Sequence, residues 1–217
     1  MNHDVMLNAS HKFGDFTLDG YVGGTMYYYY DDKVQGNTKG GLTIPGYYSL
    51  KASVDPAATS STYKSKQVNS VWGRFSASWK SAVFLDVTGR NDWSSTLAAD
   101  ARSYFYPSVS GSVVLSELFE LPEWLSFWKV RGSWTRTKKD LSVYEINNVY
   151  SVSNDAWDGM SSASYPTSIR GSLIKPKTSD SWEIGTGVNF FNNRLRVDFA
   201  YYNTLNYNLT RKATISS

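Results

Sequence analysis

Few residues in this sequence have the types and spacing that chemistry at a site requires. The chain has no cysteine, which excludes disulfides, thiolate metal sites and cysteine nucleophiles. Its histidines, His3 and His11, share one face of a predicted strand but lie too far apart to bind one metal ion together. No nucleophile, base and electrophile form a recognisable set. We therefore predict that the protein is not an enzyme and uses no cofactor or metal.

The acidic residues offer a weaker case for catalysis. Asp86, Glu183 and Asp198 are of the type that a pair of catalytic carboxylates requires. They occur in segments that also carry Arg90 and Arg196, which favours a wall of mixed charge over an acid–base pair.

Aromatic residues in the polar connections are the better indication of binding. Exposed rings beside Asn and Asp suit sugar or peptide ligands, through stacking combined with hydrogen bonds. The same rings can instead pack the loops together or contact a partner protein, and both interpretations stand at this stage. The rings that we predict to face a ligand or a covering partner are Tyr47, Tyr48, Trp93 and Trp157.

The composition narrows the class of protein. The 217 residues have a net charge of +3, which is too small to indicate a nucleic-acid partner. Aromatic residues make up 16% of the chain, too many for a disordered one. No apolar run is long enough for a transmembrane helix, whereas the strands of a transmembrane barrel alternate and need no such run. The first residues lack the pattern of a secretion signal, as in a mature or tagged chain or an internal piece of a longer one.

Alternation of apolar and polar residues, with a period of two, predicts an all-β chain. The expected strands cover residues 3–11, 16–30, 68–80, 83–92, 104–115, 128–136, 182–190 and 195–202. Polar segments 31–67, 93–102 and 137–178 are predicted to be loops, and 116–127 a helical turn or connector. Short and long connections alternate, as in outer-membrane barrels that have short turns on one side and long loops on the other.

The predicted strands have two unlike faces. Aromatic rings stand at both ends of the apolar face: Phe16, Trp79 and Phe190 beside short turns, and Tyr28, Phe105, Trp134, Trp182 and Tyr201 beside long loops. Two such rings of aromatic residues match the two interfaces of a bilayer. The other face carries charges that a dry core does not hold cheaply but a hydrated lumen does. The charges that we predict to face the lumen are Arg74, Asp86, Arg90, Arg131, Glu183 and Asp198.

Four consecutive segments resemble one known family. They are VWGRFSASWKSAVFLDVTGRNDWSS from Val71, SYFYPSVSGSVVLSE from Ser103, WLSFWKVRGSWTRT from Trp124 and LIKPKTSDSWEIGTGVNFFNNRLRVDFAYY from Leu173. Their order and spacing are similar to those of SusC/RagA-type TonB-linked outer-membrane proteins. The resemblance implies a 22-stranded transmembrane barrel in the outer membrane of a Gram-negative bacterium. It also implies a plug domain, contact with TonB through an N-terminal part, and a SusD-like surface lipoprotein as a lid.

The resemblance implies a function as well, namely energised import of oligosaccharides or peptides. About eight strands are expected here, without a plug, so we interpret residues 1–217 as a portion of the barrel wall. Two alternatives remain open at this stage. One is a passive porin or adhesive outer-membrane barrel that does not use TonB, and the other is a soluble β-sandwich that binds a ligand.

Overall fold

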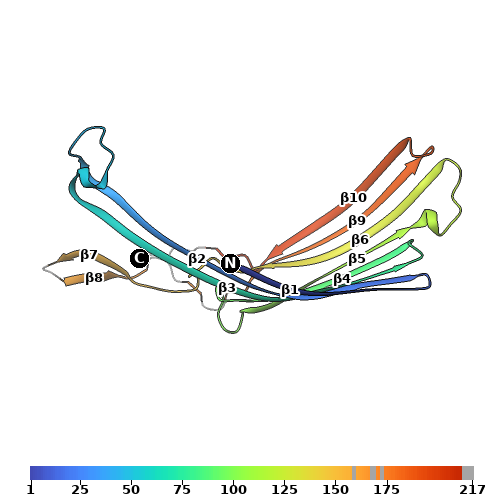
Figure 1. Cartoon of the computed structure of the whole chain (residues 1–217), viewed down its shortest axis with the longest axis horizontal. Coiled ribbons are helices and arrows are strands. Elements are labelled where there is room, and N and C mark those ends of the chain that lie inside the picture. The colour runs from blue at the N-terminus through green and yellow to red at the C-terminus, as the bar shows by residue number, and fades with distance from the viewer. Residues whose placement is uncertain (158–159, 167–169, 172–173, 212–217) are drawn as a thin grey trace.

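The computed structural model describes residues 1–157, 160–166, 170–171 and 174–211, with the backbone alone for 153–157 and 161. Eight strands form one antiparallel sheet in which each strand pairs with the next one along it. Their bounds are β1 Asn2–Phe13, β2 Phe16–Leu42, β3 Ser53–Trp79, β4 Val83–Ser94, β5 Ser103–Val114, β6 Leu125–Lys139, β9 Lys177–Phe190 and β10 Leu195–Tyr207. The prediction of an all-β meander of about eight strands is confirmed (Figure 1).

The other elements are short. Strands β7 (Ser151–Trp157) and β8 (Met160–Ser164) form a separate hairpin between β6 and β9. Single 3-10 turns are η1 (Leu50–Ala52) and η2 (Leu115–Glu117). Within the described ranges, no helix has the length and apolar character needed to cross a membrane.

Strand register places the predicted apolar residues on one continuous face of the sheet. Across the sheet, Phe75 pairs with Val87, Val87 with Val109, and Val109 with Trp134. These side chains are exposed, as are Val22 and Phe199, which are 53% and 63% accessible. A sandwich would bury this face in its interior, so the sandwich alternative is contradicted. We call this side of the sheet the apolar face and the opposite side the polar face.

Aromatic side chains gather at both ends of the apolar face. At the end with the short turns, Phe13 stacks on Phe16, and Phe16 lies beside Trp79. At the other end, Trp134 pairs with Trp182, whose ring centroid lies 5.4 Å from that of Tyr201. Along β9 the two bands are separated by the eight steps from Trp182 to Phe190, or about 27 Å at about 3.4 Å per residue. At a strand tilt of about 35–45°, this length spans about 20 Å along the membrane normal, which is close to the apolar band of about 25 Å in outer-membrane barrels.

Residues 31–67 are not the loop that the sequence indicated. Strands β2 and β3 continue through most of this segment and pair from Tyr28↔Gln67 to Asn37↔Ala58. Among the described residues, β1 pairs with β2 as far as Met1 opposite Tyr28, and β4 pairs with β3 as far as Ser94 opposite Val68. Further along, β2 and β3 continue to pair with each other. We call residues 28–42 and 53–67 the ribbon, which projects beyond the other strands of the eight-stranded sheet (Figure 1). Fifteen residues per strand reach about 50 Å at about 3.4 Å per residue.

The sequence did not predict the ribbon, because alternation of apolar and polar residues identifies only those strands that have one apolar face. Here both faces are largely polar, so backbone pairing leaves no such pattern. Other loop boundaries were wrong by a few residues for a related reason. Strand β4 extends to Ser94, β6 to Lys139 and β10 to Tyr207, all into polar sequence.

Pairing between β5 and β6 stops early at the end of the sheet with the long connections. The last pair is Ser108↔Thr135, although β5 continues to pair with β4 as far as Ser103. Pro107 comes directly before this end point and has no backbone N–H to donate. We attribute the divergence of the two strands to this missing donor.

The two faces differ in a way that adjacent substitutions can test. If the apolar face meets lipid, Val109→Arg in the intact protein places a charge against lipid on that face and costs up to about 4 kcal/mol. Ser110→Arg places the same side chain on the polar face opposite Asp86 and should be tolerated. Urea unfolding from lipid vesicles measures both. Equal losses in the two variants would contradict the assignment of the faces.

Candidate functional site

The charged residues predicted to line a lumen all lie on the polar face, and they form ion pairs there. Arg74 donates from Nε to Asp86 Oδ1 at 2.8 Å and makes a second contact through Nη2. Arg131 contacts both remaining acids, donating to the two carboxylate oxygens of Asp198 at 2.9 Å each and to Glu183 at 3.5 Å. The structure thus brings five of the six together in two groups. It pairs Arg90 with a residue that we did not single out from the sequence.

A glycine allows Arg131 to cross a strand. Arg131 on β6 pairs with Gly185 on β9, whereas Asp198 belongs to β10 on the far side of β9. A Cβ atom at Gly185 would lie 2.8 Å from Arg131 Nε, so the guanidinium occupies the space that a side chain would fill. The bare backbone of β9 is therefore what lets one arginine connect three neighbouring strands on the polar face.

A second glycine holds a tryptophan flat against the polar face. A Cβ atom at Gly23 would lie 2.6 Å from the Trp72 ring and 2.8 Å from the carbonyl oxygen of Val5. The indole N–H donates to the Thr25 hydroxyl at 2.9 Å, and Tyr21 meets the ring edge-on with centroids 5.5 Å apart. The polar contact and the close packing fix the orientation of the indole.

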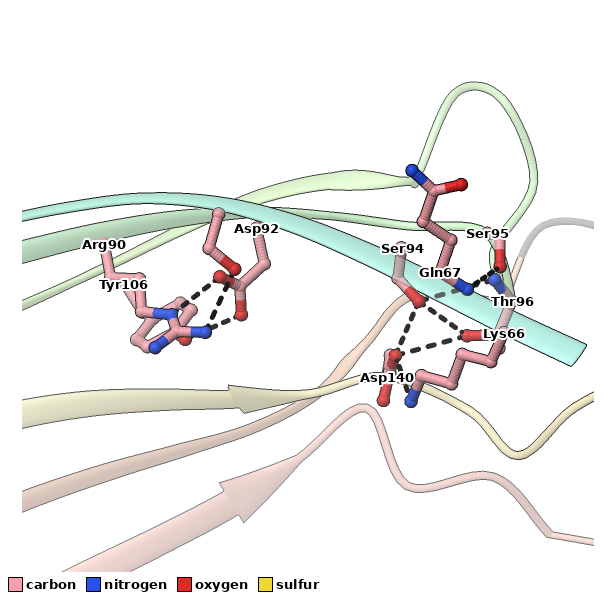
Figure 2. A network of polar contacts seen from close by, with 10 residues as sticks. Lys66, Gln67, Arg90, Asp92, Ser94, Ser95, Thr96, Tyr106 and Asp140 are labelled. Carbon is pink, nitrogen blue, oxygen red and sulfur yellow. Dashed lines mark hydrogen bonds and ion pairs between the residues drawn. The ribbon is translucent and has the colours of Figure 1, made fainter. Parts of the chain in front are cut away.

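Arg90 lies at the centre of a group of hydrogen-bonded side chains on the polar face. Its Nε donates to Asp92 Oδ1 at 2.7 Å and its Nη2 to the Ser70 hydroxyl at 3.0 Å. The Tyr106 hydroxyl donates to the other oxygen of Asp92 at 2.7 Å (Figure 2). Asp92 is 6% exposed, and these partners compensate for the burial of its charge.

Beyond Arg90, the long connections fold back over the polar face. Asp140, just after β6, accepts from Lys66 Nζ at 2.7 Å and from the Ser94 hydroxyl at 2.5 Å (Figure 2). Ser94 also hydrogen bonds with Thr96 at 2.9 Å, and both are buried. These contacts join β3, the end of β4 and the segment after β6, and we call them the loop anchor.

A small apolar cluster adjoins the loop anchor. Leu97, Tyr104 and Leu141 are buried together, and Tyr106, Ile146 and Ile174 pack against them. Apart from the two tyrosines of β5, its members come from the connections. This end of the polar face is therefore covered by its own loops.

An open hollow lies on the polar face between the fixed tryptophan and the arginine group. It has a volume of about 340 Å³, and its lining includes Tyr21, Trp72, Arg90 and Tyr106. Aromatic faces and immobilised polar groups are the components that ligand sites combine. Among the residues that the structure describes, no set of three His, Asp or Glu gathers as a metal site would require.

The four predicted loop rings lie in three different settings. Tyr47 and Tyr48 belong to the turn at the tip of the ribbon, where Tyr48 is 90% exposed. Trp93 is not in a loop but on β4, where alternation places it on the apolar face in line with Val87. Trp157 ends β7, and its side chain lies outside the described residues.

The sequence reasoning missed the residues that organise the polar face. Trp72, Asp92 and Tyr106 occupy polar-face positions of recognised strands, and their position in the alternation was the signal that could have identified them. Asp140 gave no such signal, because it stands in a long connection whose folding the strand pattern does not describe.

Comparison with known proteins identifies the sheet. The family model described as TonB dependent receptor-like, beta-barrel matches residues 2–213. The chain belongs to this family. Its expected resemblance to SusC/RagA-type receptors and its fold class are thereby confirmed, and the sheet is part of a receptor barrel. Families of this kind comprise receptors and transporters, not enzymes.

Individual relatives agree with the family. TonB-dependent receptor P3 from Formosa agariphila is 26% identical over 163 residues, which cover 72% of this chain and 16% of that protein. A structure of the RagAB peptide transporter superposes with a TM-score of 0.82 at 18% identity, covering 94% of this chain and 23% of that one. The RagAB peptide importer in its closed-closed state gives 0.80 at 20% identity, covering 93% and 23%. The chain therefore spans less than a quarter of the length of these relatives.

The fixed tryptophan generates a prediction about Gly23. Gly23→Ala should destabilise the receptor by about 1–3 kcal/mol, because the added methyl group meets a packed ring and a backbone carbonyl that cannot both move. Gly24→Ala is the matched control, since its nearest contact is an ordinary 3.5 Å. Denaturant unfolding measures the two. Equal stability of both variants would show that Trp72 is free to shift.

The loop anchor generates a prediction about Asp140. Asp140→Ala removes the partner of Lys66 and Ser94, and leaving such groups unpaired costs about 1–3 kcal/mol of local stability. We expect faster hydrogen exchange at residues 94–102 with little change in the other strands. Asp100→Ala, at an exposed position, is the control. Unchanged exchange in Asp140→Ala would mean that the connections are held by other contacts.

Proposed function

We propose that this chain is a wall segment of a TonB-dependent importer in the outer membrane of a Gram-negative bacterium. Its cargo is an oligosaccharide or a peptide. The receptor works with a SusD-like surface lipoprotein, and its plug and TonB-contacting part belong to other regions of a longer protein. Residues 1–217 supply a portion of the barrel.

The observation that carries the proposal is the sorting of side chains between the two faces of the sheet. Exposed valines and aromatic rings occupy one face, and ion pairs such as Arg74–Asp86 occupy the other. Lipid on the first side avoids exposing that face to water, and water on the second side hydrates the charges. A barrel wall in an outer membrane provides both environments at once.

The polar face is suited to line a hydrated path. Arg74, Asp86, Arg131, Glu183 and Asp198 pair across strands, so the wall carries both signs of charge close together. A neutral or mixed lining does not trap a charged cargo strongly. In our proposal these residues, together with Arg90, face the lumen or the plug.

The ribbon is suited to contact a lid. Exposed apolar and aromatic side chains gathered on one segment favour a partner that packs on them. The ribbon presents exposed Tyr30, Val34 and Tyr63, and its tip carries Tyr47 and Tyr48. The family of the chain and the printed description of RagAB as a peptide transporter support an importer with peptide as one cargo class.

The ribbon tip provides a test of the proposed partnership. Tyr47→Ala with Tyr48→Ala in the complete receptor should lower recovery of the SusD-like lipoprotein, or the rate of uptake, by about tenfold, a loss of about 1.4 kcal/mol. Phe119→Ala is the control, because this ring is 64% exposed and lies in the connection between β5 and β6, at the other end of the sheet from the ribbon tip. If uptake and lipoprotein recovery both match the control, the rings do not contact ligand or lid.

Energised import is tested separately from the lid. Uptake of the oligosaccharide or peptide that induces the receptor should stop in cells that lack TonB, although the receptor still reaches the outer membrane. Continued uptake at the same rate would instead support a passive porin.

A further inference from the structure

We propose that the apolar face carries a binding site for a phosphorylated glycolipid of the outer leaflet, formed by Arg136 and Lys138 on β6 with Asp180 on β9 and Tyr207 on β10. This inference rests on the proposed function in one respect, because it needs the outer membrane as surroundings. It concerns the lipid side of the wall and is independent of cargo and lid.

The position of these residues is fixed by strand register. Trp134 and Trp182 pair in the aromatic band at the end with the long connections. One step further out on the same face, Arg136 pairs with Asp180, and one step beyond that Lys138 pairs with Thr178. An aromatic band marks the boundary of the hydrocarbon layer, so the next positions outward lie at the level of the lipid headgroups.

These charged residues differ from the rest of the apolar face, which is uncharged between the aromatic bands. Between the two aromatic bands, alternation assigns no Asp, Glu, Lys or Arg to the apolar face in any of the eight described strands. The charges begin directly outside the band and gather on neighbouring strands β6 and β9. A charge in the hydrocarbon layer would be costly, whereas at the headgroup level it can meet an ionic partner.

The geometry holds the arginine in place. Arg136 donates from Nε and Nη2 to the two oxygens of Asp180 at 2.7 and 2.8 Å. The Tyr207 hydroxyl donates to the same carboxylate at 3.0 Å, and the guanidinium carbon lies 5.5 Å from the centroid of the Trp134 ring. Asp180 uses two of the five N–H groups of the guanidinium, and the others remain as donors for a ligand.

The charge balance favours an anion. Arg136 and Lys138 supply two positive charges against the one negative charge of Asp180. In the described part of the chain, no carboxylate lies within 4.0 Å of the Lys138 ammonium group, since the ion pairs found there are made by other residues. A phosphate on a glycolipid headgroup supplies the missing negative charge, and its sugars can stack beside the exposed rings of Trp182 and Tyr201.

Neighbouring lysines provide a matched test. Lys138 lies on the apolar face and Lys139 on the polar face of the same strand, so Lys138→Gln and Lys139→Gln remove the same charge on opposite sides. The probe is lipopolysaccharide with phosphorylated lipid A, added to the purified complete receptor in detergent. Native mass spectrometry reports the bound fraction. We expect Lys138→Gln to weaken binding about fivefold, as one cation at a lipid surface contributes about 1 kcal/mol, and Lys139→Gln to bind as the wild type does.

Two further binding measurements identify the chemical group that is recognised. Dephosphorylated lipopolysaccharide should bind to the wild type at least as weakly as the phosphorylated form binds to Lys138→Gln, because the phosphate is the proposed partner of both Arg136 and Lys138. Inorganic phosphate at the same concentration should not compete. Equal binding of the dephosphorylated form, competition by free phosphate, or equal losses in the two lysine variants would each overturn the proposal.

Failure of this inference can be distinguished from failure of the proposed function. Lys138 has no part in the proposed lumen or lid contacts, so uptake by Lys138→Gln should equal that of the wild type. An importer that takes up cargo normally and binds both forms of the lipid equally would overturn the lipid site alone. A receptor that binds lipid as expected but imports nothing would overturn the proposed function alone.

Discussion

The separation of apolar and polar side chains onto opposite faces of the sheet depends on strand register. Side chains alternate between faces with a period of two, so a slip of one residue would move Val109 to the polar face and Ser110 to the apolar face. Each of the eight strands must keep the same phase, because one strand out of phase would carry its charges into the apolar face. The continuous apolar face from β1 to β10 shows that this condition is met across the sheet. The fold and the candidate site follow from it, as does the lipid contact that we propose.

Register alone does not organise the polar face. Glycines at Gly23 and Gly185 remove side chains where Trp72 and Arg131 lie flat across neighbouring strands. The polar face thus has a second level of order, in which long side chains run across the strands and connect them. Ion pairs formed in this way are partly exposed, so each contributes little to stability. Their effect is to fix the positions of charges that water would otherwise leave free to move.

The sequence predicts the strands in which apolar and polar residues alternate, and it does not predict segments that lack this alternation. Val71 to Lys80 alternates clearly, and its strand, its partners and the placement of Arg74 on the polar face were all recoverable from the sequence. The ribbon was not, since residues such as Gln35 and Ser60 pair through their backbones with polar side chains on both faces. Trp93 was misplaced because the polar residues after it concealed the end of β4 at Ser94. The contact of Asp140 with Lys66 depends on how a long connection folds, which no local pattern encodes.

The ribbon has a mechanical consequence. A partner that pulls on the turn around Tyr47 and Tyr48 applies tension along the axes of β2 and β3. Both strands continue from the ribbon into the sheet, where β1 and β4 flank them. Hydrogen bonds between antiparallel strands run perpendicular to the strand axes, so such tension shears many bonds at once instead of opening them one after another. Tension applied at this turn is therefore carried into the eight-stranded sheet by many hydrogen bonds that are loaded together.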